Sequence, residues 1–407
     1  MPSLRNWRKK RVTESNDKKV PALRFKGFTD DWEQRKLGDM ANILRGASPR
    51  PIKDKKWFDT NSRIGWIRIS DVTSQNGRVY TLGQHLSKKG QEKTRVVSSQ
   101  TLLLSIAASV GYPVITYVET GVHDGFVIFD KPKFNLDFMF FKLQSIQNIW
   151  NKYGQAGSQV NINSSIVANT SISIPNIEEQ KRISILLKKI EENIYLQQRK
   201  LSLIKTLKRS FLSDLFFKTS TNSIVITLKQ VTSIRGGYAF KSKEFTENGY
   251  PIIKIANISN NGEIKGPYSY TNNFNKKYIL TKNDIVLAMS GATTGKIAKL
   301  RSSKSFLQNQ RIGYFCKTNN IDYNYLYYLL ISDQFKKQLK RITIAGAQPN
   351  VSSLDIENFR FSVLSSKNKQ KKISDFLNKL DIKIRITNKK ITIFSQLKRS
   401  LLNNMFI

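Results

Sequence analysis

The sequence predicts an α/β protein made of two mixed α/β domains, each followed by a long helix, with the two helices pairing as a coiled coil. Three observations lead to this prediction. A long segment recurs at an offset of 190 residues, this segment has a heptad pattern, and weaker repeats upstream resemble short strands between turns. The order domain, helix, domain, helix therefore predicts an internal pseudo-twofold repeat.

The strongest repeat aligns residues 178–216 with residues 368–406 without a gap. Fourteen of the 39 positions are identical, including the run Leu-Lys-Arg-Ser at 207–210 and 397–400. Agreement of this kind exceeds coincidence, so we expect one half of the chain to be a duplicate of the other.

Both copies predict a long helix with the same apolar seam. Apolar residues alternate at spacings of four and three, and neither run contains Pro or Gly, which is typical of helices that supercoil together. Polar residues break the two seams at matching places, Gln197 with Thr387 and Lys208 with Lys398. We therefore expect the helices to pair, the alternative being two independent amphipathic helices on separate domains. The residues expected to pair are Ile183, Leu187, Ile190, Ile194, Leu201, Ile204, Ile373, Leu377, Leu380, Ile384, Ile391 and Phe394.

The segments before the helices repeat more weakly, as short apolar runs between Gly- and Asn-rich turns. Between these strand-like runs, residues 136–150 and 323–340 predict helices. The uncharged segment 96–118 is long enough to cross a bilayer, but its serines and Pro113 favour two buried strands around a turn. The predicted parts are a basic extension at 1–29, domains at 30–173 and 220–363, and long helices at 174–219 and 364–407.

The chain is strongly basic. It contains 68 Lys and Arg against 29 Asp and Glu, a net charge of +39. An AT-rich genome would raise the Lys content but would not explain the scarcity of acids. We therefore expect a polyanionic partner, nucleic acid in preference to an anionic membrane surface.

The residue types needed for catalysis or metal binding are scarce. One cysteine, Cys316, and two histidines, His85 and His123, exclude a disulfide framework and make a protein metal cluster implausible. The basic start of the chain has no apolar core segment of a secretory signal, so the expected location is the reducing cytoplasm. We interpret both histidines as surface or hydrogen-bonded polar residues.

The run Ser290–Lys296 is similar to a phosphate loop but has the wrong spacing. Ser290 stands where the first Gly belongs, and Ile297 stands where Ser or Thr would hold magnesium. A turn that meets a DNA phosphate is the preferred interpretation. Acid-x-Lys triplets such as 179–181 lack a further acid for magnesium, and no Asn-Pro-Pro-Tyr or Gly-x-Gly-x-x-Gly run occurs. We therefore expect no catalytic residue, no metal and no cofactor in this chain.

Polar residues on loops after the predicted strands are the candidates for DNA contacts, because their side chains match donors and acceptors on base edges. Paired lysines are expected to face phosphates, which adds affinity without sequence choice. The candidates in the first domain are Arg45, Ser48, Arg50, Arg68, Lys88, Lys89, Gln159 and Asn161. Those in the second domain are Arg235, Tyr238, Lys241, Lys254, Asn257, Lys276, Lys277, Thr293, Thr294, Lys296, Gln308, Asn309, Gln310, Arg311, Gln348 and Asn350.

Two motifs connect the chain with a known family. Residues 20–25 are followed by the run 32–39, and residues 174–183 lead into the central helix with a degraded copy at 364–373. With the duplicated order, these motifs make nearly the whole chain resemble the specificity (S) subunit of type I restriction–modification systems. The second helix lacks the Pro-x-Ile-Glu-Glu-Gln start and has Ser-Ser-Lys at 365–367 instead.

The resemblance implies two target-recognition domains joined by an antiparallel pair of spacer helices. Each domain would read one half of a split, asymmetric site in double-stranded DNA. Two methyltransferase (M) subunits would bind this chain and methylate adenine with S-adenosylmethionine, and restriction (R) subunits would add ATP- and Mg-dependent cleavage for phage defence. The cofactors would therefore lie on the partners. The alternatives are a stand-alone DNA methyltransferase or nuclease with a divergent active site, and a nucleic-acid scaffold without sequence choice.

Overall fold

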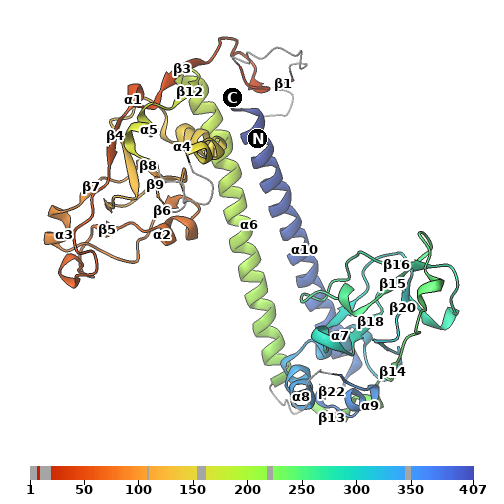
Figure 1. Cartoon of the computed structure of the whole chain (residues 1–407). Helices are drawn as coiled ribbons and strands as arrows, with labels where there is room; N and C mark the ends of the chain where they lie inside the picture. The colour runs from red at the N-terminus through yellow and green to blue at the C-terminus, as the bar shows by residue number, and fades with distance from the viewer. Residues whose placement is uncertain (1–6, 10–19, 108–109, 154–161, 218–222, 344–349) are drawn as a thin grey trace. The chain divides into compact units, whose positions relative to one another are not determined.

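The computed structural model describes residues 7–9, 20–107, 110–153, 162–217, 223–343 and 350–407 (Figure 1). The chain divides into two compact units, unit 1 with Met1–Gln198 and Lys389–Ile407, and unit 2 with Arg199–Asn388. Each unit holds one α/β domain, called head 1 in unit 1 and head 2 in unit 2, together with half of each long helix.

Head 1 is built on a five-stranded sheet in the order β4-β11-β8-β9-β6. All neighbours are antiparallel except β6 and β9. The hairpin of β8 and β9 lies in the uncharged segment 96–118, so the prediction of two buried strands around a turn is confirmed. The strands are β4 (Asn42–Arg45), β6 (Arg78–Val79), β8 (Thr101–Ser105), β9 (Pro113–Thr116) and β11 (Phe126–Asp130).

A smaller three-stranded sheet in the order β5-β10-β7 completes head 1, with β5 parallel and β7 antiparallel to β10. Two further antiparallel pairs, β1 with β2 and β3 with β12, lie outside these sheets. The strands are β1 (Trp7–Lys9), β2 (Leu23–Phe25), β3 (Glu33–Lys36), β5 (Gly65–Trp66), β7 (Arg95–Val97), β10 (Thr120–Val122) and β12 (Ser171–Ile174). The helices are α1 (Leu37–Met40), α2 (Ile69–Ser74), α3 (Lys88–Glu92), α4 (Leu136–Ser145), α5 (Ser164–Ala168) and 3-10 turns at Lys55–Trp57 and Gln147–Tyr153.

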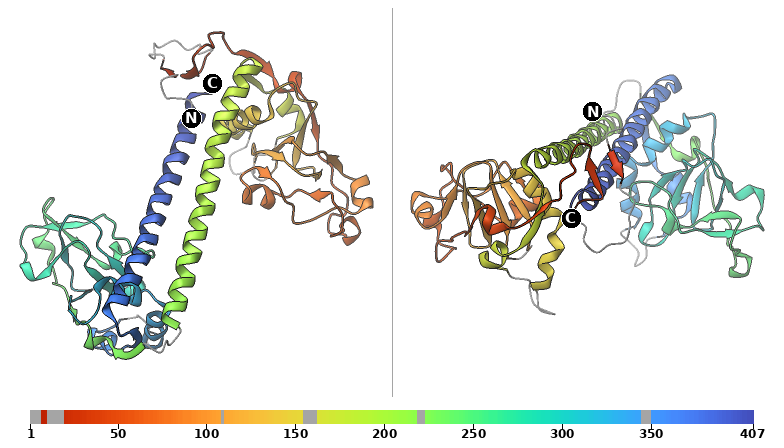
Figure 2. Two further views of the ribbon diagram at one scale, coloured as in Figure 1. Left: turned by 180° about the vertical axis from the view of Figure 1, so that it is seen from behind. Right: turned by 90° about the horizontal axis from the view of Figure 1, so that it is seen from above.

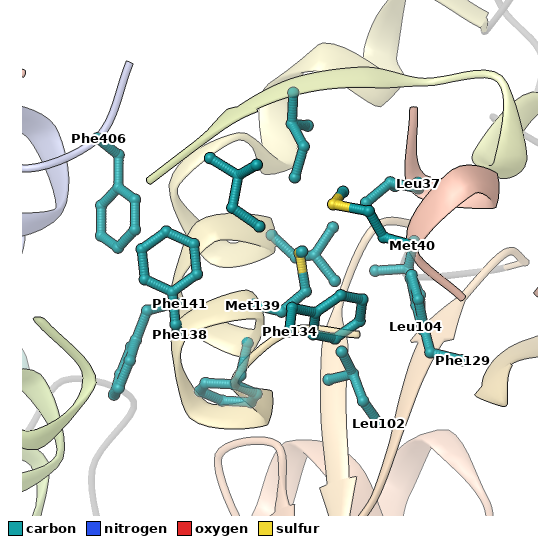
Figure 3. Close-up of a cluster of buried hydrophobic side chains, with 14 of the residues drawn as sticks. Leu37, Met40, Leu102, Leu104, Phe129, Phe134, Phe138, Met139, Phe141 and Phe406 are labelled. Atoms are coloured by element: carbon teal, nitrogen blue, oxygen red, sulfur yellow. The ribbon is translucent and has the colours of Figure 1, made fainter. Parts of the chain in front are cut away.

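The main core of head 1 lies between α4 and the large sheet (Figure 3). Phe138 and Phe141 of α4 are fully buried, as are Leu102 and Leu104 of β8. Phe406 joins them, with its ring centroid 5.5 Å from that of Phe138. Each such side chain stabilises the fold by about 1.5–3 kcal/mol through burial. The end of the chain is thus part of the core of head 1.

Head 2 repeats this architecture. Its main sheet has the order β14-β21-β18-β19, which matches β4-β11-β8-β9 of head 1 strand for strand. In its second sheet β15 is parallel and β17 antiparallel to β20, as β5 and β7 are to β10. The strands are β13 (Ser223–Thr227), β14 (Ile234–Arg235), β15 (Tyr250–Ile253), β16 (Ser269–Thr271), β17 (Ile279–Leu280), β18 (Ile285–Ala288), β19 (Ile297–Lys299), β20 (Phe306–Gln308), β21 (Ile312–Phe315) and β22 (Arg360–Leu364).

Helices and strands both contribute to the core of head 2. The predicted helix at 323–340 forms as two helices that break between Leu330 and Asp333, and Tyr325, Tyr327 and Tyr328 of the first one are buried. The helices are α7 (Tyr323–Leu330), α8 (Asp333–Thr343) and α9 (Ser353–Glu357). Short 3-10 turns cover Leu228–Gln230, Ser242–Glu244, Ile255–Asn257, Lys276–Tyr278 and Gly291–Thr293.

The two long helices are α6 (Ile177–Phe217) and α10 (Lys367–Asn404). They pack together, and within each unit their halves lie side by side in opposite directions (Figure 2). The expected seam residues of both helices are buried or half-buried. The seam also faces the heads, because Ile183 and Leu187 of α6 belong to the core of head 1, and Leu377 of α10 belongs to the core of head 2. The two alternatives for the seam thus combine, as each helix contacts both its partner helix and a head.

A matched glutamine ties each long helix to its head. The Gln180 amide donates to the Pro175 carbonyl at 2.8 Å and its Oε1 accepts the Asn135 N–H at 3.0 Å. In unit 2, Gln370 makes the same two bonds, at 2.7 and 2.9 Å, to the main chain at Leu364 and Asp322. Both glutamines are buried, which explains why this residue is identical in the two copies.

Candidate nucleic-acid interface

A half-buried ion pair occupies the lysine break in each seam. In unit 1, Lys398 of α10 donates to Glu191 of α6 at 2.7 Å, and in unit 2, Lys208 of α6 donates to Asp381 of α10 at 2.5 Å. The two pairs correspond to each other through the repeat offset of 190. The lysine breaks therefore join the two helices, although each lysine meets a carboxylate that the heptad pattern alone did not reveal. At the other break, Thr387 donates to the Lys383 carbonyl of its own helix at 2.8 Å.

Each ion pair also contacts its head. Arg78 of head 1 donates to Glu191 at 2.6 Å and to Asp137 at 2.7 Å. Burial lowers the pKa of Arg78. The neighbouring groups, Glu191 first among them, raise it by a larger amount, so the net shift of the pKa is upward and the guanidinium is charged. In unit 2, the Tyr328 hydroxyl donates to Asp381 at 2.9 Å, and Arg301 of head 2 lies 3.9 Å from the same carboxylate. The clamp between helices and head is thus built around Arg78 in unit 1, and around Tyr328 with the more distant Arg301 in unit 2.

The loop after β4 is organised around one carboxylate. Asp124 accepts Ser48 at 2.8 Å and Arg50 at 2.7 Å, and its carbonyl accepts Arg45 at 3.0 Å. Burial raises the pKa of Asp124, but Ser48 and the charge of Arg50 outweigh it, so the net shift is downward. The Arg50 side chain is 73% exposed. The loop therefore presents two arginines, a side chain that commonly contacts DNA phosphates.

An open cavity of about 910 Å³ lies beside this loop, lined by Trp66, Arg68, His85, His123 and two lysines. Burial lowers the pKa of His123, and its Nδ1 accepts the Gly125 N–H at 2.9 Å. His123 is thus a hydrogen-bonded, neutral ring. The candidates Arg45, Arg50 and Arg68 come together around this part of head 1. Lys88 and Lys89 are exposed on the short helix α3.

Two candidates in head 2 are buried, which corrects the expectation that they lie on exposed loops. Gln308 is fully buried at the end of β20, and its amide donates to the carbonyls of Arg235 and Ile312, both at 2.7 Å. Asn257 is 6% exposed and donates to the carbonyls of Lys265 and Pro267. Both side chains satisfy backbone groups where strands and turns leave them without a ladder partner.

Arg235 lies directly over this buried amide. Its Nη2 donates to the Gln308 Oε1 at 3.1 Å, and its guanidinium lies 4.5 Å from the centre of the Tyr314 ring. Arg235 is therefore half-buried and oriented by its neighbours. Tyr238 is 37% exposed and packs against Phe240 and Tyr278, so an aromatic surface accompanies the basic residues here.

The run Ser290–Lys296 forms a tight turn with positive φ at Gly291 (+73°) and Gly295 (+84°). A cavity of about 220 Å³ separates this turn from Lys336 and Lys340 of α8. The two lysines were missed at the sequence level, although their spacing of four residues places them on one face of a helix. Lys296 does not line the cavity. A basic helix face opposite a glycine turn fits a phosphate group.

The remaining candidates are distributed over the surface of head 2. Lys241, Lys276, Lys277, Gln310, Arg311 and Asn350 are exposed, whereas Lys254, Thr293, Thr294, Lys296 and Asn309 are half-buried. Gln159, Asn161 and Gln348 lie outside the described residues. In the described part of the chain, no helix is long and apolar enough to cross a membrane. Within the same part, no group of three His, Cys, Asp or Glu residues could hold a metal ion.

Known proteins resemble the chain over nearly its full length. The family model for the type I restriction modification DNA specificity domain matches it twice, over residues 29–206 and 222–393. The specificity subunit of the type I restriction enzyme MjaVIII from Methanocaldococcus jannaschii is 24% identical over 418 residues, covering 96% of this chain and 95% of the relative.

Solved structures share the fold. The S subunit of a type I restriction–modification system from M. genitalium superposes with a TM-score of 0.68 at 16% identity, covering 95% of this chain and 99% of that one. A chain from a structure of type I restriction–modification complex assembly superposes with a TM-score of 0.52 at 16% identity, covering 92% and 97%. With the duplicated family match, these findings lead to one conclusion: the chain belongs to the family of type I restriction–modification DNA specificity subunits.

Proposed function

We propose that head 1 and head 2 read the two halves of one asymmetric, bipartite site in double-stranded DNA. A specificity subunit is the non-catalytic member of its enzyme complex. The observation that carries the proposal is that the two heads share their sheet order but present different side chains at matching positions, such as Arg68 and Lys254. Two heads with the same sheet order but different side chains at matching positions suit two different half-sites.

An exchange of heads tests this proposal. Residues 30–173 are replaced by the matching segment of another specificity subunit, and N6-methyladenine is mapped in cells that carry the chimaera with its methyltransferase partner. We expect one half of the methylated motif to change and the other half to stay. A change in both halves, or no methylation by a complex that still assembles, would contradict it.

We further propose that the long helices carry two equivalent docking patches for methyltransferase subunits. In unit 1, Leu196, Ile393 and Leu397 are 56%, 51% and 42% exposed. Their counterparts at the repeat offset in unit 2 are Ile386, Leu203 and Leu207, at 52%, 64% and 50%. Clustered exposed Leu and Ile side chains mark protein interfaces, and two matched patches suit two copies of one partner.

Substitutions in one patch test the docking. We expect Leu203→Asp to remove one methyltransferase subunit from the purified complex, and Leu203→Asp with Ile393→Asp to remove both, as measured by the mass of the complex in solution. Leu354→Asp is the control, since Leu354 is 71% exposed and belongs to α9 of head 2, not to a long helix. Retention of both subunits by the double variant would refute the docking patches.

In this proposal the restriction subunits join through the methyltransferase subunits, and S-adenosylmethionine, ATP and Mg are bound by the partners in the cytoplasm. The purified chain is therefore expected to show no turnover with DNA, S-adenosylmethionine, ATP and Mg. Methylation or cleavage by the chain free of its partners would favour the alternative of a stand-alone enzyme. Equal affinity of the assembled complex for random and selected duplexes would instead favour a scaffold without sequence choice.

A further inference from the structure

The guanidinium of Arg68 in head 1 is held in place by one carboxylate. Its Nε and Nη2 donate to the two oxygens of Asp71 at 3.1 and 3.2 Å. The Asp71 side chain is 11% exposed and also accepts the Arg68 backbone N–H at 3.1 Å. The Arg68 side chain remains 45% exposed. Arg68 is thus anchored on one edge and open to solvent on the other.

The open edge has a defined hydrogen-bonding capacity. A guanidinium carries five N–H donors in a fixed plane, and Asp71 takes the one on Nε and one on Nη2. Of the three that remain, one on Nη1 and one on Nη2 point outward in parallel. Within the described residues, Asp71 supplies the only acceptors bonded to this side chain. Two parallel donors match the O6 and N7 acceptors of guanine in the major groove.

Gly83 provides the space for this arrangement. A Cβ atom at Gly83 would lie 2.8 Å from Nη2 of Arg68 and 3.8 Å from Oδ1 of Asp71, and its three nearest atoms all belong to this pair. Gly83 is not among the glycines with positive φ, so Ala fits its backbone. A methyl group here would therefore displace the guanidinium while leaving both Arg68 and Asp71 present.

The surroundings of Arg68 are basic. It lines the open cavity of head 1 together with two lysines, Lys53 and Lys55, and one acid, Asp59. The neighbour of His123 in the chain is Asp124, which gathers the arginines of the loop after β4. A positive surface of this kind attracts the DNA backbone, which brings base edges within reach of a guanidinium that is already oriented.

Head 2 uses the same backbone frame with different chemistry. Lys254 corresponds to Arg68, and its N–H donates to Oδ1 of Asn257 at 2.8 Å. Asn257 stands where head 1 has Asp71, and its amide donates to two backbone carbonyls. Head 2 therefore has no carboxylate at this position to hold a guanidinium. The Lys254 ammonium donates to the Ser269 hydroxyl at 2.7 Å and lies 4.6 Å from the centre of the Phe245 ring. Head 2 thus has a single ammonium group where head 1 has a planar guanidinium with two parallel donors.

We propose that Arg68, oriented by Asp71 and accommodated by Gly83, reads a guanine in the major groove of the half-site bound by head 1. The inference rests on the proposed function, in which head 1 reads one half-site. It adds the identity of one base and the three residues that select it. Lys254 carries a single ammonium and does not make this two-bond contact. The matching position of head 2 is therefore not expected to select guanine in this way.

The test uses the assembled complex of this chain with its methyltransferase partner. The head exchange assigns one half-site to head 1, and methylation mapping then compares wild type with Arg68→Ala, Gly83→Ala and Asp71→Asn. We expect a guanine in that half-site, which becomes degenerate with Arg68→Ala and partly degenerate with the other two. Arg63→Ala is the matched control, an exposed arginine of head 1 with no assigned DNA contact. A half-site without guanine, or an unchanged motif with Arg68→Ala, overturns the proposal.

Duplex binding supplies a second readout if a variant loses methylation altogether. Replacing the guanine by 7-deazaguanine removes N7 but keeps O6, and we expect wild-type affinity to fall about 2- to 12-fold, as for loss of one hydrogen bond. The affinity of Arg68→Ala should not respond, and inosine, which keeps O6 and N7, should leave both unchanged. Equal responses of wild type and Arg68→Ala overturn the guanine contact alone, whereas loss of the half-site assignment in the head exchange overturns the proposed function.

Discussion

Head 1 and head 2 share the strand order of their main sheets but differ in the side chains that hold the adjoining loops. Both sheets have the same strand order, yet the loop after the first sheet strand is held by the Asp124 carboxylate in head 1 and by the buried Gln308 amide in head 2. The contact to the long helices comes from Arg78 in one and Tyr328 in the other. The comparison teaches that the sheet order is shared, while the groups that position polar side chains differ between the heads.

The largest expected effect concerns what the heads have in common, which is charge. If the net charge of +39 neutralises six or more phosphates, affinity for non-specific duplex should fall roughly a thousandfold between about 50 and 200 mM salt. The slope is measured for the complex by titration at several salt concentrations. Because the phosphate contacts are independent of sequence, a head-exchange chimaera of equal charge should keep the slope. A flat salt dependence would mean that the charge serves another purpose.

The two clamps should respond unequally to loss of the head residue. Arg78→Met removes the charged bonds to Glu191 and Asp137, which keep Lys398 and Lys188, so the free energy of unfolding should fall by about 1.5–3 kcal/mol. Tyr328→Phe removes one hydrogen bond from Asp381, which keeps Lys208, and should cost about 1 kcal/mol. Urea unfolding of both variants measures the difference. Equal losses would show that the two clamps are equivalent despite their chemistry.

The smallest expected effect is a difference in pH response between the two loops. The pKa of Asp124 in the folded state lies below its ordinary value, so its stabilisation is present at neutral pH and is lost as the pH falls through the folded pKa. Asp124→Asn should lower stability by about 0.5–1 kcal/mol at pH 7, because the side chain is partly exposed. This loss should shrink as the pH falls toward 3.

Gln308→Leu is the counterpart in head 2. It leaves two main-chain carbonyls without their donor and should cost about 1–3 kcal/mol. Since an amide does not titrate, the Tm difference from wild type should be the same at pH 7 and near pH 3. A pH-dependent difference for Gln308→Leu, or a constant one for Asp124→Asn, would remove the distinction between the loops.

Sequence alone determined the duplicated architecture, because a heptad seam and gapless identity depend only on local periodicity. The seam residues, the matched lysine breaks and the hairpin in the uncharged segment 96–118 all follow from patterns within a few turns or strands. Gln180 and Gln370 stood out as identical, although their role in joining helix to head did not.

Only the tertiary structure decided which polar residues are exposed and which bond each other. Gln308 and Asn257 resemble loop residues in sequence, yet both are buried because backbone carbonyls from distant segments require donors. The Lys398 partner, Glu191, is 207 positions away, and no local pattern specifies such a pair. Arg68 was a candidate among many until its carboxylate, Asp71, and the space at Gly83 were seen together. Side-chain orientation depends on contacts between segments that periodicity does not encode, and base recognition depends on that orientation.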